Sequence, residues 1–196
     1  MLLATDLLKA ALICASSEET RYYLRGVYLA TSGHMVTTDG HRMFVARLAD
    51  RPSADVIVPY VDVTMALKLA VRAKDVEIDL AANRIGQISF QPVDGTFPDW
   101  RAVVPTGLEQ PSSKPGANDG VEHVHFNSRY VGDFEKMADI LCGKATTGQS
   151  VLHPRTASGP ALVTFGDRAD CFGVVMPIRR KPDMQAVQIR NTVLAG

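Results

Sequence analysis

The chain has 196 residues, 46% of them hydrophobic and 21% charged, which is ordinary for a globular protein with a sizeable core. Lysine plus arginine equals aspartate plus glutamate at 21 each, and this zero net charge argues against a protein that coats nucleic acid through its overall field. No apolar run approaches the ~20 residues of a membrane span, and the first residues lack the features of a signal peptide. Cys14, Cys142 and Cys171 are too scattered for a disulfide framework or zinc cluster, so we expect a reducing, cytosolic compartment.

The first sixty residues begin with a helical pattern. Apolar residues recur at helical spacing over 6–15, with Thr5 or Asp6 as the predicted N-cap. Strand patterns follow at 22–29, 35–38 and 43–48. Between the last two, Asp39-Gly40 predicts a tight turn, because glycine accepts positive φ. A hairpin with charged tips is the simplest interpretation, although a turn alone does not require His41 and Arg42 directly after it.

The same order then returns. A short strand at 56–58 leads through Pro59 into a helix predicted over 61–73. Residues 76–80 alternate as a half-buried strand does, and residues 85–90 predict another strand.

Residues 106–120 are rich in proline, glycine and serine, which predicts a linker. After it the pattern appears a third time, starting with a strand at 121–126. A helix follows, capped by Asn127 or Ser128 and ended by Gly143. Its predicted buried stripe is Tyr130, Val131, Phe134, Met137, Ala138 and Leu141, and the predicted strands after it are 151–152, 161–165 and 171–178.

A strand–helix–strands unit thus recurs three times, with a period of about sixty residues. One helix and several antiparallel strands in each unit predict helices packed on one face of a sheet. The predicted fold class is α+β, built from repeated units.

Four motifs stand at residues 20–27, 38–42, 94–101 and 174–179. In sequence, order and approximate spacing they resemble the bacterial DNA polymerase III β sliding clamp family. The resemblance implies a DNA-clamp fold in which residues 1–105 match the middle domain and residues 121–180 match the second half of the third domain. Residues 106–120 would then be a linker and 181–196 a C-terminal tail, and the family's first domain and the first half of its third have no counterpart in these segments.

In such clamps, a groove between the middle and third domains binds short peptides of polymerases and other replication proteins. The apolar members of the matching lining offer an adaptable slot for a leucine or phenylalanine, and His41, Arg42 and Arg179 can hold backbone carbonyls or a carboxylate. By position, the lining is Leu24, Thr38, Gly40, His41, Arg42, Met43, Pro105, Val174, Met176, Pro177, Ile178 and Arg179.

The family also encircles DNA as a ring of twelve strand–helix units whose helices line the hole. Three units per chain would need four chains, and the ring would need a different closing contact, because the family's usual one involves the two missing pieces. Lys68, Arg72 and Lys74 form a basic stretch on the second predicted helix that suits sequence-independent contact with phosphates. A solvated helix face explains these residues equally well.

The leading predicted function is a cytoplasmic, sliding-clamp-like replication processivity factor that docks polymerase and other clamp-binding peptides, as a homo-oligomer on duplex DNA and without a membrane partner. The alternative is a non-ring clamp-like module that binds or sequesters clamp-binding peptides and modulates host replication, and a third class is a structural oligomer with a vestigial groove. His123 and His125 share a face of a predicted strand but have no further ligands nearby, so we expect neither metal nor cofactor. Without a nucleophile motif or phosphate loop beside Asp39 and His41, we predict no enzyme.

Overall fold

The computed structural model describes residues 1–106, 124–143, 149–154, 156 and 158–178, and all structural statements below refer to these residues.

In the first unit, an α-helix follows the first strand and precedes the other strands. The predicted N-cap is wrong, because Thr5 is already helical and Ala4 caps the helix without a side-chain hydrogen bond. The elements are β1 (Leu2–Ala4), α1 (Thr5–Cys14), the 3-10 helix η1 (Glu19–Leu24), β2 (Gly26–Ala30), β3 (His34–Thr38) and β4 (Arg42–Arg47).

The second unit repeats this order with shorter strands. The helix predicted over 61–73 ends earlier, and a turn closed by the Ala73 N–H on the Ala70 carbonyl follows it. The strand predicted over 85–90 is instead a small hairpin, because Gly86 adopts a φ of 57° and turns the chain. The elements are β5 (Val56–Pro59), α2 (Tyr60–Leu69), β6 (Asp75–Asp79), β7 (Arg84–Ile85), β8 (Ile88–Ser89) and the 3-10 helix η2 (Trp100–Val103).

The third unit begins, within the described residues, at its helix. Asn127 is the N-cap, and its side chain accepts a hydrogen bond from the Arg129 N–H at 3.0 Å. Gly143 ends the helix with a φ of 81°. The elements are α3 (Ser128–Cys142), β9 (Ser150–His153), β10 (Ala161–Phe165) and β11 (Cys171–Val175).

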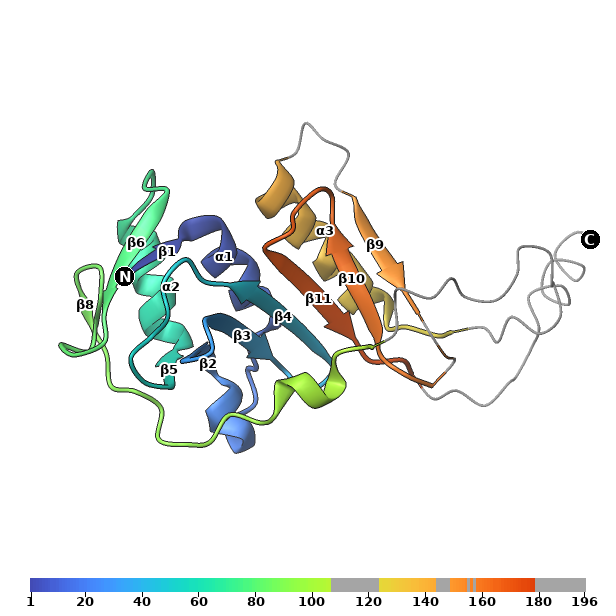
Figure 1. Ribbon diagram of the computed structural model, residues 1–196, viewed down its shortest axis with the longest axis horizontal. Coiled ribbons are helices and arrows are strands. Elements are labelled where there is room, and N and C mark those ends of the chain that lie inside the picture. Colours follow the sequence, from blue (N-terminus) through green and yellow to red (C-terminus); the bar gives the residue numbers. More distant parts are fainter. Residues whose placement is uncertain (107–123, 144–148, 155, 157, 179–196) are drawn as a thin grey trace, which may run out of the picture.

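The first two units exchange their first strands. β1 pairs with β6 and β5 pairs with β2, which gives a four-stranded sheet in the order β1-β6-β7-β8. The third unit then joins the other sheet through an antiparallel β4–β11 pair, and the seven strands run β5-β2-β3-β4-β11-β10-β9. α1 lies between α2 and α3 and contacts both (Figure 1). This arrangement confirms the predicted α+β fold class with helices on antiparallel sheets.

The core has two apolar clusters because side chains on successive strand residues point to opposite faces of the sheet. On β4, Phe44 and Ala46 belong to the cluster that contains the helices, whereas Met43 and Val45 belong to the second cluster. That second, outer cluster also contains Phe97, from the segment before η2, and Trp100, the first residue of η2. The outer face of the sheet therefore has its own core, and the candidate site lies there.

Other element predictions need correction. Residues 22–24 belong to η1, and β2 starts only at Gly26, where an added Cβ would lie 2.5 Å from the Val58 carbonyl oxygen. Residues 124–126 form no strand, and 121–123 lie outside the described residues. The final strand, predicted over 171–178, ends at Val175, shortly before Pro177, which has no N–H to donate.

The division into 1–105, a linker at 106–120, a half-domain at 121–180 and a tail at 181–196 stays a prediction. Apart from Thr106, the linker and the tail lie outside the described residues. No helix in the described parts of the chain is long and apolar enough to cross a membrane.

Candidate functional site

The β4–β11 pair brings together the two segments from which the groove was predicted. Met43 lies opposite Val174, and Arg42 lies opposite Val175. Beyond the ladder, the Met176 N–H donates to the His41 carbonyl oxygen at 2.8 Å. Residues 41–43 and residues 174–176 thus meet along one line, although more than 130 positions separate them in the sequence. We call this line the seam (Figure 1).

The apolar residues predicted to form the slot make a closed floor under the seam. Leu24, Met43 and Val174 are only 4%, 3% and 1% exposed. All three belong to the outer cluster, where Phe97 and Trp100 also pack. Half-buried side chains lie against this floor and carry the apolar surface that a partner can reach: Tyr23, Leu162 and Phe172.

The tight turn between β3 and β4 forms the polar side of the seam. Gly40 adopts a φ of 88°, which confirms the prediction that glycine takes a positive φ in this turn. The Asp39 carboxylate accepts hydrogen bonds from the backbone N–H groups of His41 at 2.8 Å and Arg42 at 2.9 Å. The Thr38 hydroxyl donates to the Arg42 carbonyl at 2.7 Å and accepts from the Gly40 N–H. This network fixes the turn and leaves His41 exposed.

Arg42 is not a free donor at the rim. Its Nε contacts Asp39 at 3.0 Å, its Nη1 binds Asp133 of α3, and its guanidinium lies 4.9 Å from the centre of the Tyr130 ring. Only 13% of the side chain is exposed. Arg42 therefore ties β4 to α3, and the role of holding a peptide carboxylate, predicted for this residue, has to compete with two internal carboxylates.

Asp133 is held in its charged form by two cations. Lys136 contacts it at 2.6 Å from the solvent side, and Arg42 contacts it from the sheet side. Burial alone would raise the pKa of Asp133, but the hydrogen bonds from Lys136 and Arg42 outweigh burial and lower it.

His41 and Tyr130 form the exposed part of the rim. Their rings stack at a centroid distance of 5.8 Å and an interplanar angle of 17°. The prediction from sequence gave Tyr130 only a place in the buried stripe of its helix, yet it is half-buried and faces the turn. No local pattern near Tyr130 or Asp133 signals that a turn 90 residues earlier lies beside them, because their partners come from the sheet pairing.

The remaining predicted lining residues lie at the end of β11 and after η2. Met176 and Pro177 are half-buried, and Ile178 is exposed and donates its N–H to the His125 carbonyl at 2.6 Å. Pro105 is half-buried behind η2, and Arg179 lies outside the described residues.

The basic residues predicted to contact DNA are all exposed. Only Lys68 lies on α2, however, because Arg72 and Lys74 fall in the connection between α2 and β6. The predicted placement of all three on the second helix is therefore wrong for Arg72 and Lys74, and the contact with DNA stays a prediction.

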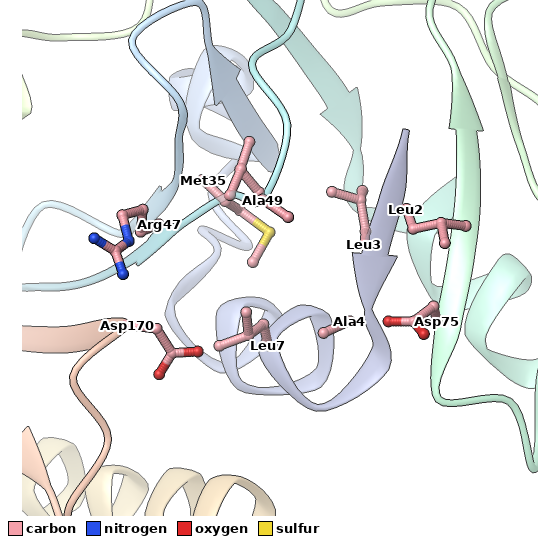
Figure 2. A pocket seen from close by; sticks show the side chains of 10 residues that line it. Leu2, Leu3, Ala4, Leu7, Met35, Arg47, Ala49, Asp75 and Asp170 are labelled. Atoms are coloured by element: carbon pink, nitrogen blue, oxygen red, sulfur yellow. The ribbon is translucent and has the colours of Figure 1, made fainter.

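A separate hollow of about 460 Å³ opens between β1, α1 and the β3–β4 pair. Figure 2 shows apolar side chains, among them Leu3, Leu7 and Met35, with Arg47 and Asp170 at one side. None of the predicted groove residues lines this hollow. Among the described residues, no group of three or more His, Cys, Asp or Glu side chains is placed to hold a metal ion.

Comparisons with known proteins identify the family. A family model described as the DNA polymerase III beta subunit, central domain, matches residues 3–99. Beta sliding clamps of Rickettsia bellii and Salmonella typhimurium are 36% identical over 116 residues and 32% identical over 112. These matches cover 50% of this chain but only 30% and 31% of the two relatives, so the chain spans less than a third of their length.

Solved structures share the fold over almost the whole chain. A sliding clamp of Bartonella birtlesii, bound to griselimycin, aligns over 92% of this chain and 66% of its own, with a TM-score of 0.62 and 25% identity. The beta subunit of Thermotoga maritima gives a TM-score of 0.66 at 16% identity, over 92% of this chain and 65% of its own, and shows the fold alone. This chain is therefore a clamp-like protein of the DNA polymerase III β sliding clamp family.

Proposed function

We propose that the seam is a docking site for short linear peptides of replication proteins. The observation that carries this proposal is the juxtaposition of the β3–β4 turn with the end of β11, linked by the hydrogen bond from Met176 to His41. Apolar floor, half-buried apolar surface and an exposed polar rim adjoin one another there. Shallow sites of this composition bind peptides by placing one or two apolar anchors and fixing the backbone with hydrogen bonds.

The burial of the floor determines how a peptide would bind. Leu24, Met43 and Val174 leave almost no surface open, so an apolar anchor packs first on Phe172, Leu162 and Met176. Methionine side chains rearrange at low cost, and movement of Met43 or Met176 would deepen the site. His41 supplies the exposed ring nitrogens for a backbone carbonyl or a side-chain oxygen.

Fluorescence anisotropy with a labelled clamp-binding peptide tests the site. We expect saturable binding that His41→Ala and Met176→Ala each weaken about tenfold, which corresponds to ~1.4 kcal/mol. Lys9→Ala is the matched control, because Lys9 is exposed on α1 and outside the seam. Absence of saturable binding, or equal weakening by the control, would exclude the proposal.

We further propose that peptide docking serves a processivity factor, assembled from several chains on duplex DNA in the cytosol and without catalytic activity of its own. Family membership and the exposed cations Lys68, Arg72 and Lys74 support this assignment. The alternative is a module that does not form a ring and sequesters clamp-binding peptides. That alternative needs only the seam, which lies within one chain.

Retention on circular DNA separates the two functions. A ring stays on a closed circle in high salt and is released when the circle is cut, because the link is topological and independent of phosphate contacts. A sequestering module shows the same salt-sensitive binding, or none, on both DNA forms.

A further inference from the structure

The end of the β3–β4 pair away from the seam carries a cluster of positive charge. His34 of β3 lies opposite Arg47 of β4. Both share the outer face with Val36 and Val45, because side chains two residues apart on a strand point the same way. Directly opposite residues of an antiparallel pair have Cβ atoms about 5 Å apart. Arg47 therefore lies beside His34, at the edge of the outer face.

Arg101 reaches the same place from η2. Its guanidinium lies 4.2 Å from the centre of the Trp100 ring, and its Nη2 donates to the Ser32 hydroxyl at 2.8 Å. The Trp100 ring centre is in turn 5.3 Å from that of His34. Because Trp100 belongs to the outer cluster, these contacts hold Arg101 on the outer face, next to the turn between β2 and β3.

A third arginine, Arg51, packs against that turn. An added Cβ at Gly33 would lie 3.3 Å from its Cγ. Burial lowers the pKa of His34, and the three nearby guanidiniums lower it further, so this ring adds no positive charge at neutral pH. All three arginines are exposed, and none forms an ion pair within the part of the chain that the structure describes. We call Arg47, Arg51 and Arg101 the arginine corner.

The carboxylates around the arginine corner mostly have other partners. Asp55 accepts hydrogen bonds from a tyrosine hydroxyl at 2.8 Å and a backbone N–H at 2.7 Å, and Asp99 accepts one from a backbone N–H at 3.2 Å. Asp170 is paired with an arginine of the third unit. Asp50 is exposed and opposes the binding of an anion. These charges reduce the local positive potential, but they leave guanidinium N–H groups open to a ligand.

The arginine corner and the floor of the seam lie on one face, at the two ends of the same strand pair. Met43 is four positions before Arg47 on β4, which corresponds to ~13 Å. Phe172, which we assign to the apolar anchor of a peptide, lies opposite Val45, two positions from Arg47. A peptide extended along this face from Phe172 therefore reaches the corner within about two to four residues.

We propose that the arginine corner binds acidic residues that flank the apolar anchor of a docked peptide. This inference rests on the proposed function, to which it adds a preference for charge. A carboxylate fits the guanidinium fork through two parallel hydrogen bonds, and charges at the rim of an interface contribute more to selectivity than to affinity. Peptides with aspartate or glutamate about two to four residues from the anchor are thus preferred over neutral ones.

Fluorescence anisotropy with three labelled clamp-binding peptides of equal length tests this preference. One has glutamines on both sides of the anchor, and the others have glutamates on the N-terminal or the C-terminal side. We expect one acidic peptide to bind about tenfold tighter than the neutral peptide at low salt, and this advantage to fall below about threefold in about 0.5 M salt. No gain from either acidic flank, or an equal gain from both, would overturn the proposal. Failure of all three peptides to bind would exclude the docking site itself, and this preference with it.

Single substitutions then locate the preference, measured as the ratio of the dissociation constants of the neutral and acidic peptides. Arg51→Gln and Arg101→Gln should each lower this ratio from about tenfold to about threefold. Arg51 packs on the turn, so its variant stays informative if loss of Arg101 disturbs Trp100. Asp50→Asn should raise the ratio about twofold, and Arg84→Gln is the matched control, because Arg84 is exposed on β7 of the other sheet. A ratio that survives both arginine variants, or falls equally in the control, would overturn the proposal.

Discussion

The helices α1 and α2 occupy equivalent places in two units of one chain, but they differ in what covers them. α1 packs against α3, and its Ala10 and Cys14 are completely buried. Met65 and Leu69, at the same places counted from the first residue of α2, are 52% and 61% exposed. The distance between two packed helices depends on the side chains at their contact, and small ones let the helices approach closely. The comparison shows that the side-chain size on this face follows its neighbour, while the backbone framework stays the same.

The largest expected effect comes from removing the packing that α3 provides. Phe134 is fully buried against the sheet, and an added Cβ at Gly173 of β11 would clash with its ring. Phe134→Ala should lower the free energy of unfolding by about 3–5 kcal/mol, measured by urea denaturation. Leu69→Ala, on the exposed face of α2, should change it by less than about 0.5 kcal/mol. Similar costs for both would contradict the difference between the two helices.

The ion pair between β4 and α3 should have the next largest effect. Asp133→Asn leaves the Arg42 guanidinium with one carboxylate partner in a mostly buried position. We expect a loss of about 1.5–3 kcal/mol in the free energy of unfolding. Lys136→Gln removes the other cation of Asp133, but that lysine is 69% exposed, so it should cost less than about 1 kcal/mol. Equal costs would show that the contact of Asp133 with Arg42 stabilises the fold no more than its exposed contact with Lys136 does.

Two threonine hydroxyls offer a smaller test of the same comparison. Thr37, completely buried on β3, donates to the Ala11 carbonyl of α1 at 2.7 Å. Thr64 of α2 has a buried hydroxyl oxygen without a hydrogen-bond partner among the described residues. Thr37→Val should cost about 1 kcal/mol, while Thr64→Val should be neutral or slightly stabilising in thermal unfolding. A destabilising Thr64→Val would mean that this hydroxyl has a partner.

Acid should weaken the contacts of the third unit with α1 and β4. Hydrogen bonds from Arg168 lower the pKa of Asp170, and Arg168 also contacts Asp6 of α1 at 2.7 Å. The pKa of Asp133 is lowered as well. Because the folded-state pKa values lie below the unfolded value of about 3.9, the stabilisation is complete above about pH 4 and is lost as the pH falls through the lowered values. In the Asp133→Asn variant, the urea concentration at the unfolding midpoint should fall less steeply as the pH is lowered. An unchanged fall would exclude Asp133 as a source of the pH dependence.

The sequence was sufficient to predict the fold class, the three helices and the turn at Asp39-Gly40, because periodicity, caps and glycine positions are local signals. The meeting of residues 38–43 with 174–178 followed from family resemblance and agrees with the β4–β11 pairing. Local patterns could not show that Met43 and Val174 are buried, since they belong to one apolar cluster with residues from distant segments, among them Leu24, Phe97 and Trp100. Nor could they show that Arg42 is paired with Asp133, because that contact depends on where α3 packs.

Methyl NMR of the methionines, during titration with a clamp-binding peptide, tests the central claim most directly. Met176 lies at the seam, Met43 in its floor, and Met65 on the exposed face of α2. The account predicts that the Met176 signal shifts most, Met43 follows, and Met65 does not move. A shift confined to Met65, or saturable binding with no change at Met176, would show that peptides bind elsewhere and would contradict the account.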